Sequence, residues 1–182
     1  MENKSKKTYW PHMILGFLAI GITLGYWTVK SANSLPVQEV NKYMLKYQQA
    51  DLSINQILEK KIAFDKAYSI ELKNVEMMVM TDNINSNRPQ PNVVKLVKGD
   101  NSFSYVVHTK DGKTVNDVNA SFLLTQPHSR TEDVMIESVP FSNGMYRIDK
   151  LNIQKPGRYT LQFRATIGDK TGYSEIAAYL NP

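Results

Sequence analysis

The stretch NGMYRIDKLNIQKPGRYTLQFRATIGDKTGYSEIAAYL, residues 143–180, carries the pattern on which the fold depends. Three of its segments alternate apolar and polar residues with the period of a half-buried strand: Met145–Leu151, Arg158–Ile167 and Tyr173–Leu180. Turn-forming residues precede or separate them: Asn143-Gly144, Pro156-Gly157 and Gly168-Asp169-Lys170. The spacing therefore predicts three consecutive antiparallel strands joined by short turns.

The same alternation continues towards the N-terminus. It predicts further strands over residues 69–79 and at Val93–Val97, Phe103–Thr109, Val115–Leu124 and Val134–Phe141. Turns are expected at Gly99-Asp100-Asn101 and Asp111-Gly112-Lys113. So many short strands in about 110 residues indicate a mainly β domain, an immunoglobulin-like antiparallel β-sandwich. A small closed barrel is the alternative.

The expected core of this sandwich consists of the apolar residues that share one face of each strand. They are Phe103, Tyr105, Val107, Phe122, Leu124, Tyr146, Ile148, Tyr159, Leu161, Phe163 and Ala165.

A second decisive stretch is Trp10–Val29, WPHMILGFLAIGITLGYWTV, which has no Asp, Glu, Lys or Arg. Twenty helical residues span about 30 Å, the thickness of a bilayer's hydrocarbon core. Aromatic residues at both ends suit the two membrane interfaces. We therefore expect a retained transmembrane helix over residues 10–30. A secretory signal cleaved near residues 30–34 and a buried soluble helix are the alternatives.

The lysines give this helix a direction. Lys4, Lys6 and Lys7 precede it, whereas only Lys30 follows closely. The positive-inside rule then places residues 1–9 in the cytoplasm. The expected location is the bacterial inner membrane, crossed once, with the C-terminal domain in the periplasm.

A helical connecting arm is expected over residues 31–68, followed by the periplasmic domain at 69–182. Its apolar residues fall at helical spacing in two segments, about 36–50 and 53–66. The residues of this pattern with candidate partner-binding roles are Val40, Met44, Tyr47 and Ile54. Ser53 and Gln56 have capping-box spacing at the second segment. The arm packs either on its own domain or on a partner.

Composition excludes several classes of function. The net charge of +5 is modest and spread along the chain, so nothing favours nucleic acid as a partner. The absence of cysteine excludes disulfides, thiolate metal sites and a cysteine nucleophile. No nucleotide fingerprint or catalytic triad order is present, so we do not expect an enzyme.

Several local motifs, taken in order, resemble the FixH family, also called CcoH-type proteins. The similarity extends over about residues 10–180. The motifs are Trp10-Pro11, Val40-Asn41, residues 47–56 (YQQADLSINQ), residues 111–115 (DGKTV), residues 124–127 (LTQP), residues 144–146 (GMY) and residues 156–161 (PGRYTL). Two positions depart from the family pattern: Gln126 stands where Arg is expected, and Tyr159 where Trp is common.

The resemblance implies an accessory factor for a cbb-type haem–copper cytochrome oxidase, one that acts by contact and has no cofactor of its own. Its expected partners are the oxidase subunits, other oxidase-assembly membrane proteins and the lipid bilayer. Within the helix, Gly21 and Gly25 have the Gly-x-x-x-Gly spacing that permits close helix packing.

Copper binding or delivery is the alternative function. Thioether and imidazole groups suit copper, and the candidate ligands are Met78, Met80, His108 and His128. On a strand, Met78 and Met80 share one face, and Met77 points to the other. A third interpretation is an anchored sandwich domain with a partner outside respiration, because this fold hosts many functions.

Overall fold

The computed structural model describes residues 9–34, 44, 53–81, 87, 89–127 and 129–182. The chain divides into two compact units, Met1–Val37 and Gln38–Pro182. The first contains helix α1, Trp10–Ser34, which continues four residues beyond the predicted end at Lys30. Within it, Trp10–Ala32 is long and apolar enough to cross a membrane. Its length, composition and N-terminal place fit a membrane anchor or a signal sequence.

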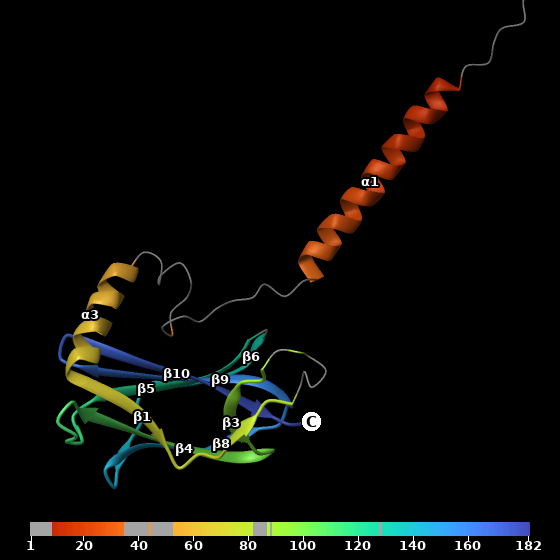
Figure 1. The fold of residues 1–182 in the computed structure, drawn as a ribbon. Coiled ribbons are helices and arrows are strands. Elements are labelled where there is room, and N and C mark those ends of the chain that lie inside the picture. The colour runs from red at the N-terminus through yellow and green to blue at the C-terminus, as the bar shows by residue number, and fades with distance from the viewer. Residues whose placement is uncertain (1–8, 35–43, 45–52, 82–86, 88, 128) are drawn as a thin grey trace, which may run out of the picture. The chain divides into compact units, whose positions relative to one another are not determined.

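The second unit is a sandwich of two β-sheets, as predicted (Figure 1). Sheet A has four antiparallel strands in the order β1-β4-β8-β7. Their bounds are β1 Tyr68–Lys73, β4 Gly99–Thr109, β7 Phe141–Ser142 and β8 Met145–Ile153.

Sheet B has six strands in the order β2-β3-β10-β9-β5-β6. Their bounds are β2 Met77–Val79, β3 Asn92–Leu96, β5 Asn119–Gln126, β6 Ser129–Ile136, β9 Gly157–Ile167 and β10 Lys170–Leu180. The pairing of β3 with β10 is parallel, so the prediction of a wholly antiparallel sandwich was wrong at this pair. A parallel pair needs a long crossover connection, and most of the domain lies between β3 and β10 in the sequence.

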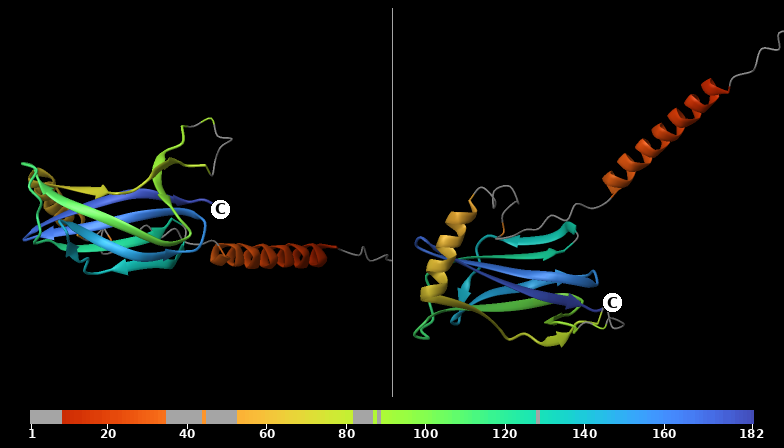
Figure 2. Two further views of the ribbon diagram at one scale, coloured as in Figure 1. Left: turned by 90° about the horizontal axis from the view of Figure 1, so that it is seen from below. Right: turned by 45° about the horizontal axis from the view of Figure 1, so that its top comes forward.

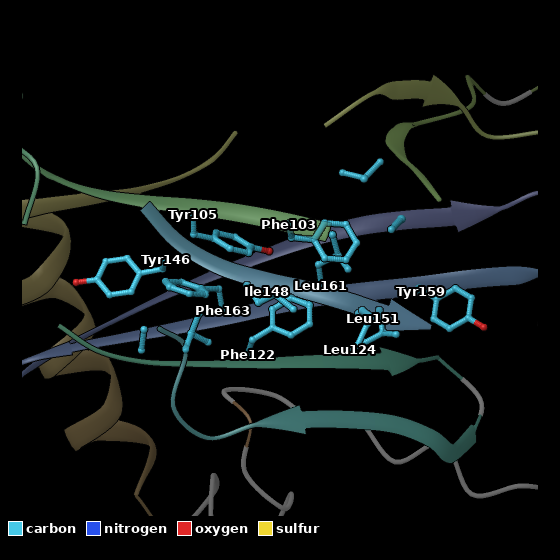
Figure 3. Close-up of a cluster of buried hydrophobic side chains, with 14 of the residues drawn as sticks. Phe103, Tyr105, Phe122, Leu124, Tyr146, Ile148, Leu151, Tyr159, Leu161 and Phe163 are labelled. Carbon is cyan, nitrogen blue, oxygen red and sulfur yellow. The ribbon is translucent and has the colours of Figure 1, made fainter. Parts of the chain in front are cut away.

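The core lies between the two sheets, and Figure 3 shows its aromatic centre. Every residue of the predicted core is buried. The rings of Tyr105 and Phe163 are stacked, with centroids 4.2 Å apart and planes at 8°. Strand alternation alone was sufficient to identify these positions, because each strand presents one face to the opposite sheet.

Three of the five predicted turns lie at junctions between consecutive strands, as expected, and two differ: the three are Asn143-Gly144, Pro156-Gly157 and Gly168-Asp169-Lys170. Asn143 and Gly144, with φ of 52° and 79°, join β7 to β8 as a tight hairpin. At Asp111-Gly112 the turn forms, but only one bridge, His108 to Thr114, follows it. The chain then leaves sheet A, so β5 of sheet B begins at Asn119 and not at Val115.

The other differences lie at strand ends. The predicted turn at 99–101 belongs to β4, because the Asn101 side chain itself bonds the backbone of Val97 and Gly99 and closes the turn before it. The strand predicted at Val134–Phe141 is divided into β6, which begins at Ser129, and the short β7.

Helix α3, Ile54–Ala67, confirms the second predicted helical segment to within one residue at each end. Figures 1 and 2 show it across the end of the strands that is far from the C-terminus. Ser53 is its N-cap residue, but the side chain makes no capping hydrogen bond. The buried residues are Ile57 and Phe64, whereas Ile62 is 54% exposed.

Phe64 packs against β10 at a glycine. A Cβ built on Gly172 would lie 2.3 Å from two ring carbons of Phe64, well inside van der Waals contact. The ring also lies 5.2 Å from that of Tyr68, where β1 begins. Phe64 therefore fixes α3 to both sheets, at a place where only glycine leaves enough room.

Candidate functional site

The predicted membrane-helix contact lies on α1. Gly21 and Gly25 have nothing within 4 Å of an added Cβ, and the described side chains from Trp10 to Ala32 are all exposed. The hydroxyl of Thr28 donates to the carbonyl of Leu24 at 2.8 Å, so this polar group is satisfied within the helix. The glycines thus form an open, narrow strip suited to close approach of another helix.

The predicted arm residues are only partly described. Val40 and Tyr47 lie outside the described residues, and Ile54 is half-buried in the first turn of α3. The Met44 sulfur lies 3.8 Å from the hydroxyl of Ser121 on β5, so Met44 contacts its own domain. The Arg164 Nε donates to the same hydroxyl at 3.0 Å.

The methionines predicted as copper ligands lie in a small apolar cluster. Met80 is buried with Val93 and Tyr179, and Met78 packs against them. Met77 points to the other face of β2 and is 52% exposed, as alternation predicts. These sulfur atoms therefore fill a gap on the outer face of sheet B, which is a common use of methionine.

His108 lies at the other end of the sandwich. It pairs with Ser69 near the start of β1, the strand that directly follows α3. Met78 pairs with Val93 of β3, next to the C-terminal end of β10. Along β10, the six residues from Gly172 to Ala178 span about 20 Å. The structure therefore does not bring His108 together with the two methionines, and His128 lies outside the described residues.

The His108 side chain lies beside a carboxylate on the outer face of sheet A. Its Nε2 lies 3.9 Å from a carboxylate oxygen of Glu71, whose other oxygen accepts from Lys73 Nζ at 2.6 Å. The Lys73 hydrogen bond is the main cause that lowers the pKa of Glu71. Within the described residues, no three His, Asp or Glu side chains gather as a metal-binding group.

A feature that the sequence did not predict is a cavity of about 210 Å³ between the two sheets. It is lined by Leu124, Val134, Ile153, Tyr159, Asp133, Asn152 and Gln154, and most of its exposed lining is polar. The Tyr159 hydroxyl donates to the carbonyl of Lys155 at 2.8 Å, which holds the ring in place. Alternation predicts which residues point inwards, but not where the stacked sheets leave space.

Comparison with known proteins supports a related family. Residues 86–164 match the model of the family described as YtkA-like, a family that includes FixH-like proteins. This match covers β3 to β8 and most of β9, but less than half of the 182 residues. It supports kinship at the level of the sandwich domain.

No curated protein matches the chain. Among solved structures, the chain is similar to the catalytic domain of LPMO Lmo2467 from Listeria monocytogenes, at 14% identity and a TM-score of 0.36. The alignment covers 53% of this chain and 64% of that one, so the chain spans less than two thirds of that domain.

Proposed function

We propose that this chain is a membrane-anchored, non-enzymatic accessory factor for the assembly or stability of a cbb-type haem–copper cytochrome oxidase, acting by protein–protein contact. The match of residues 86–164 to a family that includes FixH-like proteins carries the proposal. The ordered motifs of the whole chain, which resemble FixH-type proteins, extend it to the helix and the arm. The domain is held in the periplasm, with the N-terminus in the cytoplasm.

Helix α1 supports contact within the membrane. Its apolar side chains are exposed on all sides, and the strip at Gly21 and Gly25 is open. Because lipid tails are as apolar as leucine, close backbone packing at small residues is a main source of helix association. A helix of an oxidase subunit or of another assembly protein is the proposed occupant.

The domain supports a role without chemistry of its own. An enzyme needs convergent polar side chains in a pocket, whereas the contact of the His108 side chain with Glu71 lies on the outer face of sheet A. Copper delivery, the alternative from the sequence, gains no support from the described ligands, because Met78 and His108 belong to opposite ends of the sandwich.

The proposal is tested by purifying the tagged full-length chain in mild detergent and measuring oxidase subunits in the eluate. Wild-type protein is expected to carry the oxidase, and Gly21→Leu with Gly25→Leu is expected to lose at least 80% of it, an estimate for a contact that depends on close backbone approach. Gly16→Leu is the matched control, since it has the same open space but a different position on the helix. Absence of oxidase from the wild-type eluate, together with normal oxidase levels in a deletion strain, contradicts the proposal.

A further inference from the structure

The outer face of sheet B is covered where β5 and β9 run side by side. Ala120, Phe122 and Leu124 of β5 lie in the core, so the residues between them point to the opposite face. Those residues, Ser121 and Leu123, are only 1% and 6% exposed. Antiparallel strands commonly have one solvated face, so burial on this side indicates a further layer above the sheet.

The neighbouring strand shows the same burial. Leu161 and Phe163 of β9 lie in the core, and Gln162 between them pairs with Leu123 and is buried as well. The Gln162 Oε1 atom is shielded from solvent and has no hydrogen-bond partner among the described residues. An amide oxygen on an open face would bond to water, so this part of the face is not open.

Met44 reaches this face from the segment between α1 and α3. Its Sδ atom accepts from Ser121 Oγ at 3.8 Å, and the same hydroxyl accepts from Arg164 Nε at 3.0 Å. Met44 is half-buried, and it belongs to the compact unit that contains the sandwich, Gln38–Pro182. Because methionine is unbranched and flexible, it suits the uneven surface that Ser121 and Arg164 form.

The backbone of Met44 also indicates a fixed position. Its φ of 58° is a left-handed conformation, which residues other than glycine adopt at a cost in free energy. Such a conformation persists where the surrounding contacts hold it. The contact of the Met44 side chain with Ser121 is of this kind.

We propose that Met44 is a latch that fastens the chain to the outer face of sheet B beside Ser121 and Leu123. The sandwich is then attached at Met44, ten residues after the end of α1 at Ser34, and not at Ser53, nineteen residues after it. Ten residues extend at most about 36 Å, and nineteen at most about 68 Å. The latch therefore shortens the reach of the domain from the end of α1. Its consequence for a membrane partner rests on the proposed function, whereas the latch itself does not.

The absence of cysteine permits a test by thiol labelling of the full-length protein. Ser121→Cys places a thiol beside Met44, and Asn119→Cys places one at an exposed position on the same strand. The probe is a polyethylene glycol maleimide, whose addition is measured from the change in electrophoretic mobility. The thiol of Ser121→Cys is expected to react at least tenfold more slowly than that of Asn119→Cys, because access controls the reaction.

Changes at Met44 identify what covers the thiol. Met44→Gly removes the side chain and suits the positive φ, so it removes the contact without backbone strain. It is expected to raise the labelling rate of Ser121→Cys at least fivefold and to leave that of Asn119→Cys unchanged. Met44→Leu, which keeps most of the apolar volume, is the matched control, with an expected change within twofold. Unchanged labelling of Ser121→Cys in the Met44→Gly protein, shown to be folded by circular dichroism, would overturn the proposal.

A second measurement uses the protein without substitutions. Dilute hydrogen peroxide is expected to oxidise Met44 at least threefold more slowly than Met77, which is 52% exposed, as measured by mass spectrometry of peptides. Oxidation of Met44 as fast as that of Met77 in the folded protein contradicts the latch. Since neither measurement contains oxidase, failure here is distinguishable from failure of the oxidase proposal.

Discussion

The two sides of the sandwich are finished differently. Between β1 and β10, helix α3 covers the gap and inserts Phe64, which is 1% exposed, against Gly172. Between β8 and β6, sheet A ends in the two-residue strand β7, and a cavity remains. The first side is closed by a large ring in a space without room for a Cβ. The second retains unfilled volume among the described residues.

This difference predicts where the fold is most sensitive to substitution. A side chain that fills a close-packed gap stabilises the fold. If it is removed, the surrounding residues relax only partly, so most of its contacts are lost. Natural sheets usually protect a free edge, and here Lys150, with φ of 56°, interrupts the regular edge of β8 with a bulge opposite β4.

The closed side should be the most sensitive to mutation. Phe64→Ala is expected to lower the free energy of unfolding by about 3–5 kcal/mol, because it empties a buried aromatic site. Gly172→Ala is expected to cost about 1–3 kcal/mol through the clash of its new Cβ with the same ring. Urea unfolding, followed by near-ultraviolet circular dichroism of the buried tyrosines, measures both changes.

The double variant tests whether the two effects share one contact. With alanine at position 64 there is no ring for the new Cβ to meet. The decreases in the free energy of unfolding of the two single variants should therefore sum to more than the decrease in the double variant. Glu175→Ala, exposed on the same strand, is the control, with an expected change within about 0.5 kcal/mol. Strict additivity would show that Phe64 does not close this side as described.

Tyr105 lies in the core between the two sheets, so a substitution there provides a comparison for both sides. Its buried hydroxyl has no hydrogen-bond partner among the described residues, and burial raises its pKa. Tyr105→Phe is therefore expected to raise the free energy of unfolding by about 1 kcal/mol.

The pH dependence of stability provides a second readout for Tyr105. In the unfolded chain a tyrosine loses its proton near pH 10, whereas the buried group keeps it, so this part of the stability falls as pH rises above about 10. The fall should be shallower in Tyr105→Phe, measured by urea titration between pH 8 and about 11. A loss of stability in the variant at neutral pH would mean that the hydroxyl is satisfied.

The open side should tolerate added volume. Val134→Phe is expected to change the free energy of unfolding by less than about 1 kcal/mol, since the new ring enters existing space. A destabilisation comparable to that of Gly172→Ala would remove the contrast between the two sides.

Much of the sandwich follows from local sequence. Alternation identified Tyr105, Leu161 and Phe163 as core residues, because a strand with one buried face repeats every second residue. Asn143-Gly144 identified a hairpin, since both residues tolerate the positive φ of its turn. These signals are short-range and need no knowledge of the opposite sheet.

What the sequence did not reveal depends on distant packing. Nothing near Phe64 indicates that it meets Gly172, and nothing near Ile62 indicates that the helix turns this residue away from the core. The parallel pairing of β3 with β10 and the cavity beside Val134 depend on how the sheets are ordered and stacked. His108 lies apart from Met78 and Met80 for the same reason, because residue type carries no information on which strand ends lie near each other.

The most direct test of the central claim is oxidase activity in membranes of a strain that lacks this chain, measured as oxygen consumption with reduced cytochrome c. The account predicts a loss of at least half of the cbb-type activity, an order-of-magnitude expectation for removal of an assembly contact. Full-length protein and Gly16→Leu should restore it, and Gly21→Leu with Gly25→Leu should not. Undiminished activity in the deletion strain, with oxidase subunits at their normal level, would contradict the account.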